Sequence, residues 1–298
     1  MQNHQPDLEA ELFLDSHCAL AEGPLWDERK QQLLWVDILQ KTVHCLDEGA
    51  SQTQQTVYPE TVGTVALSDN GNWLVALRQQ VILCPPHSPL GKILFNAKEV
   101  YPANRFNDGK STPDGAFLVG TMDMDEKAPN GRLYWFNAAG YAKTILPAVT
   151  ISNGMAWDLP RKRLYYIDTP TQQVQVASYD PASGDMGEFR PFLTVPTELG
   201  YPDGMTVDSD GNLYIAMWSG GRVAVFNADT AEYQYSINVA APNTTCPVFG
   251  GKDLDELYIT TAKVGLNEDQ YQKYPASGGI FRVKLAAKGL PAYRFAEG

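Results

Sequence analysis

The sequence is poor in histidine and cysteine, and both shortages exclude common kinds of site. All four histidines lie in the first third of the chain, and none is paired at zinc-ligand spacing: His4, His17, His44 and His87. A histidine-based zinc centre or a Ser-His-Asp triad is therefore not expected. No Cys-x-x-Cys pair exists, so the four cysteines are expected to be reduced thiols: Cys18, Cys45, Cys84 and Cys246.

Positive charge and long apolar runs are scarce as well. The formal net charge is −12, which repels phosphate backbones and anionic bilayers, so neither nucleic acid nor membrane is an expected partner. No apolar run approaches the ~20 residues that cross a bilayer. The first residues also lack the charged and apolar regions of a signal peptide, so we expect a cytoplasmic protein. Neither a Gly-x-Ser-x-Gly motif nor a phosphate-binding glycine loop occurs.

What the sequence does contain is a repeat. Six times, about 40 to 50 residues apart, a similar strand start returns, within the range of periods typical of repeat folds. The six starts, given by their residue numbers, are 22–26, 62–66, 108–110, 153–157, 203–207 and 246–249. With 44% hydrophobic residues and no linker or low-complexity tract, the chain has enough apolar side chains for a packed core.

The repeat that begins at Asp203 shows what one unit contains. Strands are predicted at 205–207, 212–218 and 222–226, because the residues between them form Asp-Gly and Gly-Gly turns that favour hairpins. A unit of roughly 45 residues with four short strands is typical of one propeller blade. A two-sheet sandwich would not explain a repeat of this length.

The sequence therefore predicts an all-β fold, a six-bladed β-propeller closed by its N-terminal strand. We expect one domain over residues 1–298, with a strand at about 8–16 that completes the last blade. Ring closure would hide sheet edges that otherwise invite aggregation.

The residue that opens each repeat is the main functional clue. The six positions hold Glu22, Val62, Asp108, Asn153, Asp203 and Cys246, so four of the six carry an oxygen donor. In a propeller these positions converge at one mouth of the central channel. Carboxylate and amide oxygens suit Ca²⁺, Mg²⁺ or Mn²⁺. Turn formation alone could explain any single Asp or Asn, but it does not explain Glu22, Asn153 and Asp203 at matched register.

A second clue is the Arg105–Lys110 stretch, Arg-Phe-Asn-Asp-Gly-Lys. It places a guanidinium, an amide and a carboxylate at one strand start. An arginine there could hold carbonyl or hydroxyl oxygens of a substrate, or it could pair with neighbouring acids.

Motifs along the whole chain resemble the SMP-30/gluconolactonase/luciferin-regenerating-enzyme family, regucalcin-like members included. They are 22–27, 105–110, 120–122, 151–154, 165–168, 202–205, 220–223, 249–252 and 278–281. The resemblance implies a six-bladed propeller with one divalent cation, Ca²⁺ first, with Zn²⁺, Mn²⁺, Mg²⁺ and Fe²⁺ left open. It implies Glu22, Asn153 and Asp203 as metal ligands and Arg105, Asn107 and Asp125 as substrate contacts.

The function that follows is metal-dependent hydrolysis of a sugar lactone to its aldonic acid. Asp203 is the candidate base, and a hydroxide bound at the ion is the alternative. Hydrolysis of phosphotriesters on the same site and calcium binding without lactonase activity remain open. A protein-interaction propeller is a third alternative, against which the rim of oxygen donors argues. The preferred sugar, the role of Asp108 and the oligomeric state are not readable from the sequence.

Overall fold

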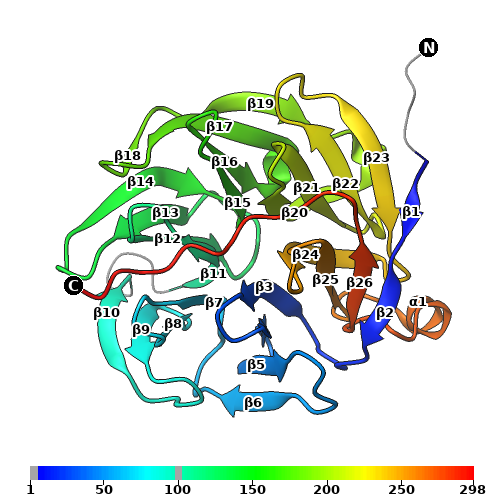
Figure 1. Ribbon diagram of the computed structural model, residues 1–298, viewed down its shortest axis with the longest axis horizontal. Helices are drawn as coiled ribbons and strands as arrows, with labels where there is room; N and C mark the ends of the chain where they lie inside the picture. The colour runs from blue at the N-terminus through cyan, green and yellow to red at the C-terminus, as the bar shows by residue number, and fades with distance from the viewer. Residues whose placement is uncertain (1–5, 98–102) are drawn as a thin grey trace.

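Six β-sheets stand around a central axis, and each contributes its first strand to the middle of the ring (Figure 1). The computed structural model describes residues 6–97 and 103–298. Strands dominate these residues, and the few helices are the short α1 (Glu268–Lys273), η1 (Thr169–Thr171) and η2 (Thr197–Leu199). The predicted all-β propeller with six blades is confirmed.

The first three blades follow one another along the chain. The first holds β3 (Ala21–Asp27), β4 (Gln32–Asp37), β5 (Thr42–Asp47) and β6 (Gln54–Val57). The second holds β7 (Thr64–Leu67), β8 (Trp73–Ala76), β9 (Gln80–Cys84) and β10 (Lys92–Asn96). The third holds β11 (Asn104–Ser111), β12 (Phe117–Asp123), β13 (Gly131–Phe136) and β14 (Ala142–Val149).

The last three blades complete the ring. The fourth holds β15 (Ser152–Asp158), β16 (Arg163–Asp168), β17 (Gln173–Asp180), β18 (Asp185–Met186) and β19 (Arg190–Thr194). The fifth holds β20 (Tyr201–Val207), β21 (Asn212–Trp218), β22 (Arg222–Asn227) and β23 (Tyr233–Asn238). The sixth holds β24 (Asn243–Gly250), β25 (Glu256–Ala262) and β26 (Ile280–Lys284).

The fifth blade shows how sequence sets these strands. Its predicted strands lie within β20, β21 and β22, and the turn between the first two is held by Asp208. The Asp208 carboxylate accepts hydrogen bonds from the backbone N–H groups of Asp210 and Asn212, at 3.0 and 2.8 Å. Such side-chain-to-backbone bonds favour a turn over a longer strand. The turn interpretation of residues 208–211 is therefore confirmed.

The core lies between neighbouring blades. One buried cluster joins β15–β17 of the fourth blade to β20–β22 of the fifth, with Tyr165, Met205 and Ile215 fully buried. Because each blade is covered on both faces, middle strands such as β21 are apolar almost throughout instead of alternating.

The N-terminal residues join two blades. The short strand β1 (Leu8–Glu9) pairs in parallel with β23 of the fifth blade. The next strand, β2 (Glu11–Leu14), pairs antiparallel with β26 of the sixth. The single strand expected at about 8–16 is thus two short strands, of which only the second lies in the sixth blade's sheet.

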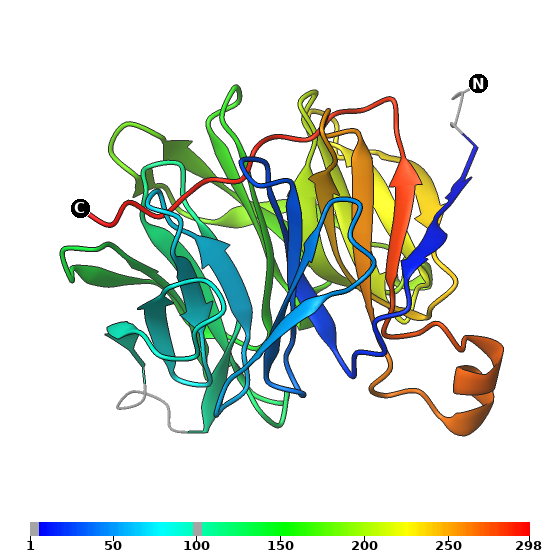
Figure 2. The same ribbon diagram turned by 60° about the horizontal axis from the view of Figure 1, so that its bottom comes forward.

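The C-terminal segment, residues 285–298, leaves β26 and crosses one face of the ring (Figures 1 and 2). It forms bridges with the fifth blade at Asp208 and with the second at Ser68. Its residues Leu290–Tyr293 also line one end of a cavity in the channel, to which inner strands of all six blades contribute. The channel is therefore covered at this end.

Candidate metal and substrate site

The predicted site residues stand at irregularities that repeat from blade to blade. Pairing between the first two strands shifts by one residue after Glu22, Phe106, Asn153, Pro202 and Thr244. A β-bulge of this kind turns a side chain away from the regular pleat. The matched register seen in the sequence is therefore a matched bulge at the inner edge of five blades.

Glycines permit the close packing around these bulges. A Cβ on Gly154 would lie 2.6 Å from the carbonyl oxygen of Asp203, and one on Gly204 would lie 2.4 Å from the Cys246 sulfur. Any larger residue would push the neighbouring inner strands apart. The glycines after Asn153 and Asp203 thus let neighbouring inner strands approach closely.

All three predicted metal ligands are largely withdrawn from solvent. Glu22 on β3, Asn153 on β15 and Asp203 on β20 are 9%, 5% and 5% exposed. The inner strands that carry them meet near the centre of the ring in Figure 1. Buried polar groups of this kind need hydrogen-bond partners, and Asn153 has more of them than the two carboxylates do.

A chain of hydrogen bonds fixes the amide of Asn153. Its Oδ1 accepts a bond from Asn107 Nδ2 at 3.0 Å, and its Nδ2 donates to Thr169 Oγ1 at 2.8 Å. Asn107 Oδ1 in turn accepts from Arg105 Nη1, and Thr169 Oγ1 donates to the Pro202 carbonyl. The chain therefore links the third, fourth and fifth blades, and it joins the predicted substrate pair to a predicted metal ligand.

The carboxylates of Glu22 and Asp203 have fewer hydrogen-bond partners than the Asn153 amide. Burial raises the pKa of Glu22, and the neighbouring Asp108 charge raises it further. Burial likewise raises the pKa of Asp203 well above its ordinary value, and Glu22 and Asp108 add to the effect. Among the described residues, none donates a hydrogen bond to the Asp203 carboxylate. These acids repel one another, and extra positive charge would relieve that repulsion.

Asp108 lies beside them with half of its carboxylate unpaired. Its Oδ1 accepts a bond from the Gly109 N–H at 2.7 Å. Its Oδ2 is buried with no hydrogen-bond partner among the described residues. Burial raises the pKa of this group too. The orphaned oxygen and the crowded acids both fit a cation with water in its coordination sphere.

The donor set also fits a hard cation better than zinc. Within residues 6–97 and 103–298, no group of three or more His, Cys, Asp and Glu side chains is placed to hold a metal. The predicted trio has only two such residues, since its third donor is the Asn153 amide. Burial raises the pKa of the Cys246 thiol well above its usual range, so the one sulfur on the rim stays protonated.

The guanidinium of Arg105 is the main positive charge among these groups. The residue is 8% exposed, and burial lowers its pKa to about 10, so it stays charged at neutral pH. The acids that oppose this shift are Glu126, then Glu22 and Asp203. Arg105 therefore lies among acids on several sides.

Asp125 has a less direct position than the sequence suggested. It is exposed in the turn after β12, where its N–H donates to Asp123. The acid whose charge reaches Arg105 and Asp203 is its neighbour Glu126, which adopts a positive φ of 56°. The role of Asp125 in substrate binding stays a prediction. Sequence reasoning missed Glu126 because the loop's course depends on that local backbone turn.

Comparison with known proteins now places the chain. The model of the SMP-30/Gluconolactonase/LRE-like region matches residues 20–263. The chain belongs to this family. Among curated relatives, YvrE of Bacillus subtilis, by its name a candidate sugar lactone lactonase, is 34% identical over 97% of this chain and 99% of its own. Regucalcin of Sus scrofa is 33% identical over 97% and 99%.

Solved structures agree in fold. A luciferin-regenerating enzyme is 29% identical, with a TM-score of 0.85 over 94% of this chain and 96% of its own. A regucalcin of Agrobacterium tumefaciens, described as a calcium-binding protein, has a TM-score of 0.91 at 23% identity over 97% and 98%. The curated relatives thus carry the names sugar lactone lactonase and regucalcin. In the part of this chain that the structure describes, no helix is long and apolar enough to cross a membrane.

Proposed function

We propose that this protein hydrolyses an aldonolactone, a cyclic sugar ester, to the aldonic acid with the help of one divalent cation. The observation that carries the proposal is the set of buried oxygen donors at the bulges of β3, β15 and β20, in a member of a family with lactonase-named relatives. Their excess negative charge is what a cation would balance.

Glu22, Asn153 and Asp203 would hold the cation, Ca²⁺ first among the candidates because all three donors are oxygens. When bound, the cation would polarise the lactone carbonyl and stabilise negative charge that develops on its oxygen. The hydrogen bonds that Asn153 makes to Asn107 and Thr169 orient its amide for this task.

The remaining residues would bind and orient the sugar. Arg105 has donors to offer to ring and hydroxyl oxygens, and its bond to Asn107 holds the guanidinium in place. Asn107 in turn donates to the Ser152 carbonyl at 2.8 Å, which ties the pair to the fourth blade. Asp125 and Glu126 stand on the loop after β12, where they could contact more distant hydroxyls.

Asp203 would take the proton from the attacking water. The water oxygen forms a bond to the lactone carbonyl carbon, and the ring ester bond to that carbon then breaks. The proton passes to the departing ring oxygen, so the product carries one hydroxyl and one carboxylic acid.

The experiment is lactone hydrolysis by chelator-stripped protein, followed with a pH indicator. The panel comprises five- and six-membered aldonolactones and one phosphotriester, with each divalent ion added back in turn. Turnover of a lactone that returns with metal supports the proposal. Metal-restored turnover of the phosphotriester alone would replace it with the phosphotriesterase alternative. Tight Ca²⁺ binding without turnover of any substrate would favour a calcium-binding protein.

A further inference from the structure

One lysine lies inside the channel, close to the proposed metal site. Lys110 on β11 lines the channel cavity together with Asp108. Its Nζ donates to two main-chain carbonyls, those of Met155 at 3.0 Å and Met205 at 2.7 Å. Both carbonyls belong to inner strands, which have no further strand to pair with at the channel edge. The ammonium thus satisfies acceptors that the sheets leave open.

The positions of these carbonyls relate directly to the proposed ligands. Met155 stands two residues after Asn153, and Met205 stands two residues after Asp203. In β15 the bulge falls between Asn153 and Met155, and in β20 it falls between Pro202 and Met205, so that Asp203 lies within it. Lys110 therefore binds β15 and β20 just after the bulges that orient Asn153 and Asp203, two of the three proposed oxygen donors.

The inter-blade bond of Thr64 does not have this relation. Thr64 Oγ1 donates to the Gly109 carbonyl at 3.0 Å and joins the second blade to the third. It contacts neither β15 nor β20 through this bond. Lys110 is the side chain whose hydrogen bonds tie both of these ligand-bearing strands to β11.

We propose that Lys110 is a positioning residue that fixes the distance between Asn153 and Asp203 by holding the Met155 and Met205 carbonyls. This role rests on the proposed function, since it concerns the same cation site. The ammonium of Lys110 would then be a fixed positive group of the protein, whereas the proposed divalent ion can exchange. In this role it acts through the Met155 and Met205 carbonyls and not through contact with the substrate or the ion.

A positioning role and a simple charge effect predict opposite changes in Ca²⁺ affinity when Lys110 is removed. The charge of Lys110 lowers the pKa of Asp108, so it reaches the acids at the mouth. In a titration at a pH where the acids are already ionised, an effect of charge alone would mean that removal of this lysine removes a repulsion and tightens Ca²⁺ binding. If positioning matters, removal lets the two strands relax and weakens Ca²⁺ binding.

The test is calorimetric titration of Ca²⁺ into chelator-stripped full-length protein, for the wild type and for Lys110→Met. We expect Ca²⁺ affinity about 10-fold weaker in the variant, the usual scale for loss of a group that supports metal ligands. Thr64→Val is the matched control, because it removes one buried inter-blade bond and should leave affinity within about 2-fold of wild type. Lys110→Gln, which is also uncharged, serves for the same titration if Lys110→Met does not fold.

Equal or tighter Ca²⁺ binding by a folded Lys110 variant would overturn the positioning role while the proposed function stands. A wild type that binds no divalent ion would overturn both. Weaker binding in Thr64→Val to the same extent would also overturn it, since any lost inter-blade bond would then suffice.

Discussion

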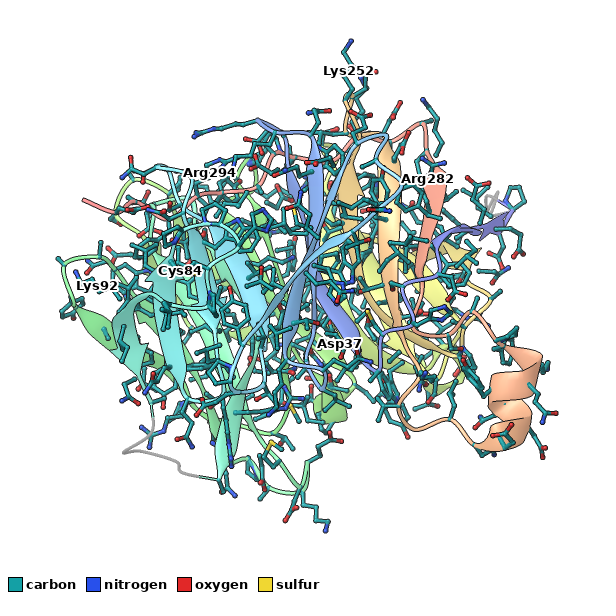
Figure 3. All side chains as sticks on the ribbon, turned by 90° about the horizontal axis from the view of Figure 1, so that it is seen from below. Asp37, Cys84, Lys92, Lys252, Arg282 and Arg294 are labelled. Carbon is teal, nitrogen blue, oxygen red and sulfur yellow. The ribbon has the colours of Figure 1, made fainter. Side chains whose placement is uncertain are left out.

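The two ends of the central channel differ in how their buried charged groups are arranged. At the mouth, buried carboxylates crowd together, and Asp108 Oδ2 has no hydrogen-bond partner among the described residues. At the far end the C-terminal segment lies across the ring, and the opposite charges there form ion pairs: Arg294 contacts Asp27 at 2.6 Å and Glu28 at 3.1 Å, although Arg294 Nε and Glu28 Oε2 have no hydrogen-bond partner among the described residues. Figure 3 shows Arg294 toward the face that this segment covers.

The same contrast holds for apolar contacts and backbone bonds. Phe295 is fully buried against the second and third blades, and its N–H and C=O pair with Leu67 and Asp69. The ring of Tyr293 meets Trp157 of the fourth blade edge to face. The covered end therefore holds blades together, whereas the mouth holds buried acids that repel one another and carries the proposed site. If the proposed site is correct, stability and function are separated along one axis.

The largest expected effect comes from removal of a carboxylate at the mouth. Asp203→Ala should lower lactone turnover by at least about a hundredfold and weaken Ca²⁺ binding, because it removes both a ligand and the proposed base. It should not lower the melting temperature of the metal-free protein, since it also removes a source of repulsion. Turnover and thermal unfolding of the stripped variant check both parts, and wild-type turnover would contradict the assignment.

The opposite pattern is expected at the covered end. Phe295→Ala should cost about 3–5 kcal/mol of unfolding free energy, the usual range for a fully buried phenylalanine. Turnover per folded molecule and Ca²⁺ affinity should stay unchanged. Urea unfolding measures the loss, and we expect one transition because the segment contacts several blades.

Leu290→Ala is the matched control from the same segment, since Leu290 is 37% exposed and should cost far less. Loss of Ca²⁺ affinity in Phe295→Ala at full folding would show that the two ends are coupled rather than separate.

A pH series separates the ends without mutation. The pKa of Glu22 rises to about 8 in the folded protein, so between its ordinary value and pH 8 the folded state holds a proton that the unfolded chain releases. Metal-free stability should therefore fall as pH rises through this window. Bound Ca²⁺ needs the ionised acids, so its stabilising effect should grow over the same range.

The buried His44 has the opposite effect on how stability changes with pH, and it sets the lower pH limit of the experiment. Burial lowers the pKa of His44 to about 4, so its contribution to stability is lost as pH falls from 6.5 toward 4. Melting temperatures should therefore be compared from pH 6.5 to 8.5, with chelator and with Ca²⁺. A metal-free melting temperature that does not fall over this range would contradict the account of the mouth.

The sequence predicts more of the mouth of the channel than of the covered end. Repeats and Asp-Gly turns identify the blades, and the Gly after Glu22, Asn153 and Asp203 marks the register at which the ligands converge. The bulges themselves leave no further signal, because a shift in pairing depends on both strands. Lys110 was readable as part of a motif, but its reach to Met155 and Met205 depends on blades brought together only by ring closure.

The covered end was not predicted at all. Residues 285–298 show no strand alternation, and their contacts are single backbone bonds and isolated side chains on several blades. Such a segment gains its place from tertiary contacts rather than from local propensity. Its role therefore becomes visible only in the assembled ring.

The smallest expected effect concerns the two acids on the loop after β12. Glu126 affects Arg105 from an exposed position, so solvent screens much of its charge. Glu126→Gln should raise KM for the lactone a few-fold at low salt with kcat little changed, and the difference should shrink as salt is added. Asp125→Asn is the paired variant: a larger, salt-independent rise in KM there would assign the sugar contact to Asp125. Equal, salt-independent effects in both variants would mean that the loop contacts the sugar through both side chains, and that the long-range charge of Glu126 contributes little.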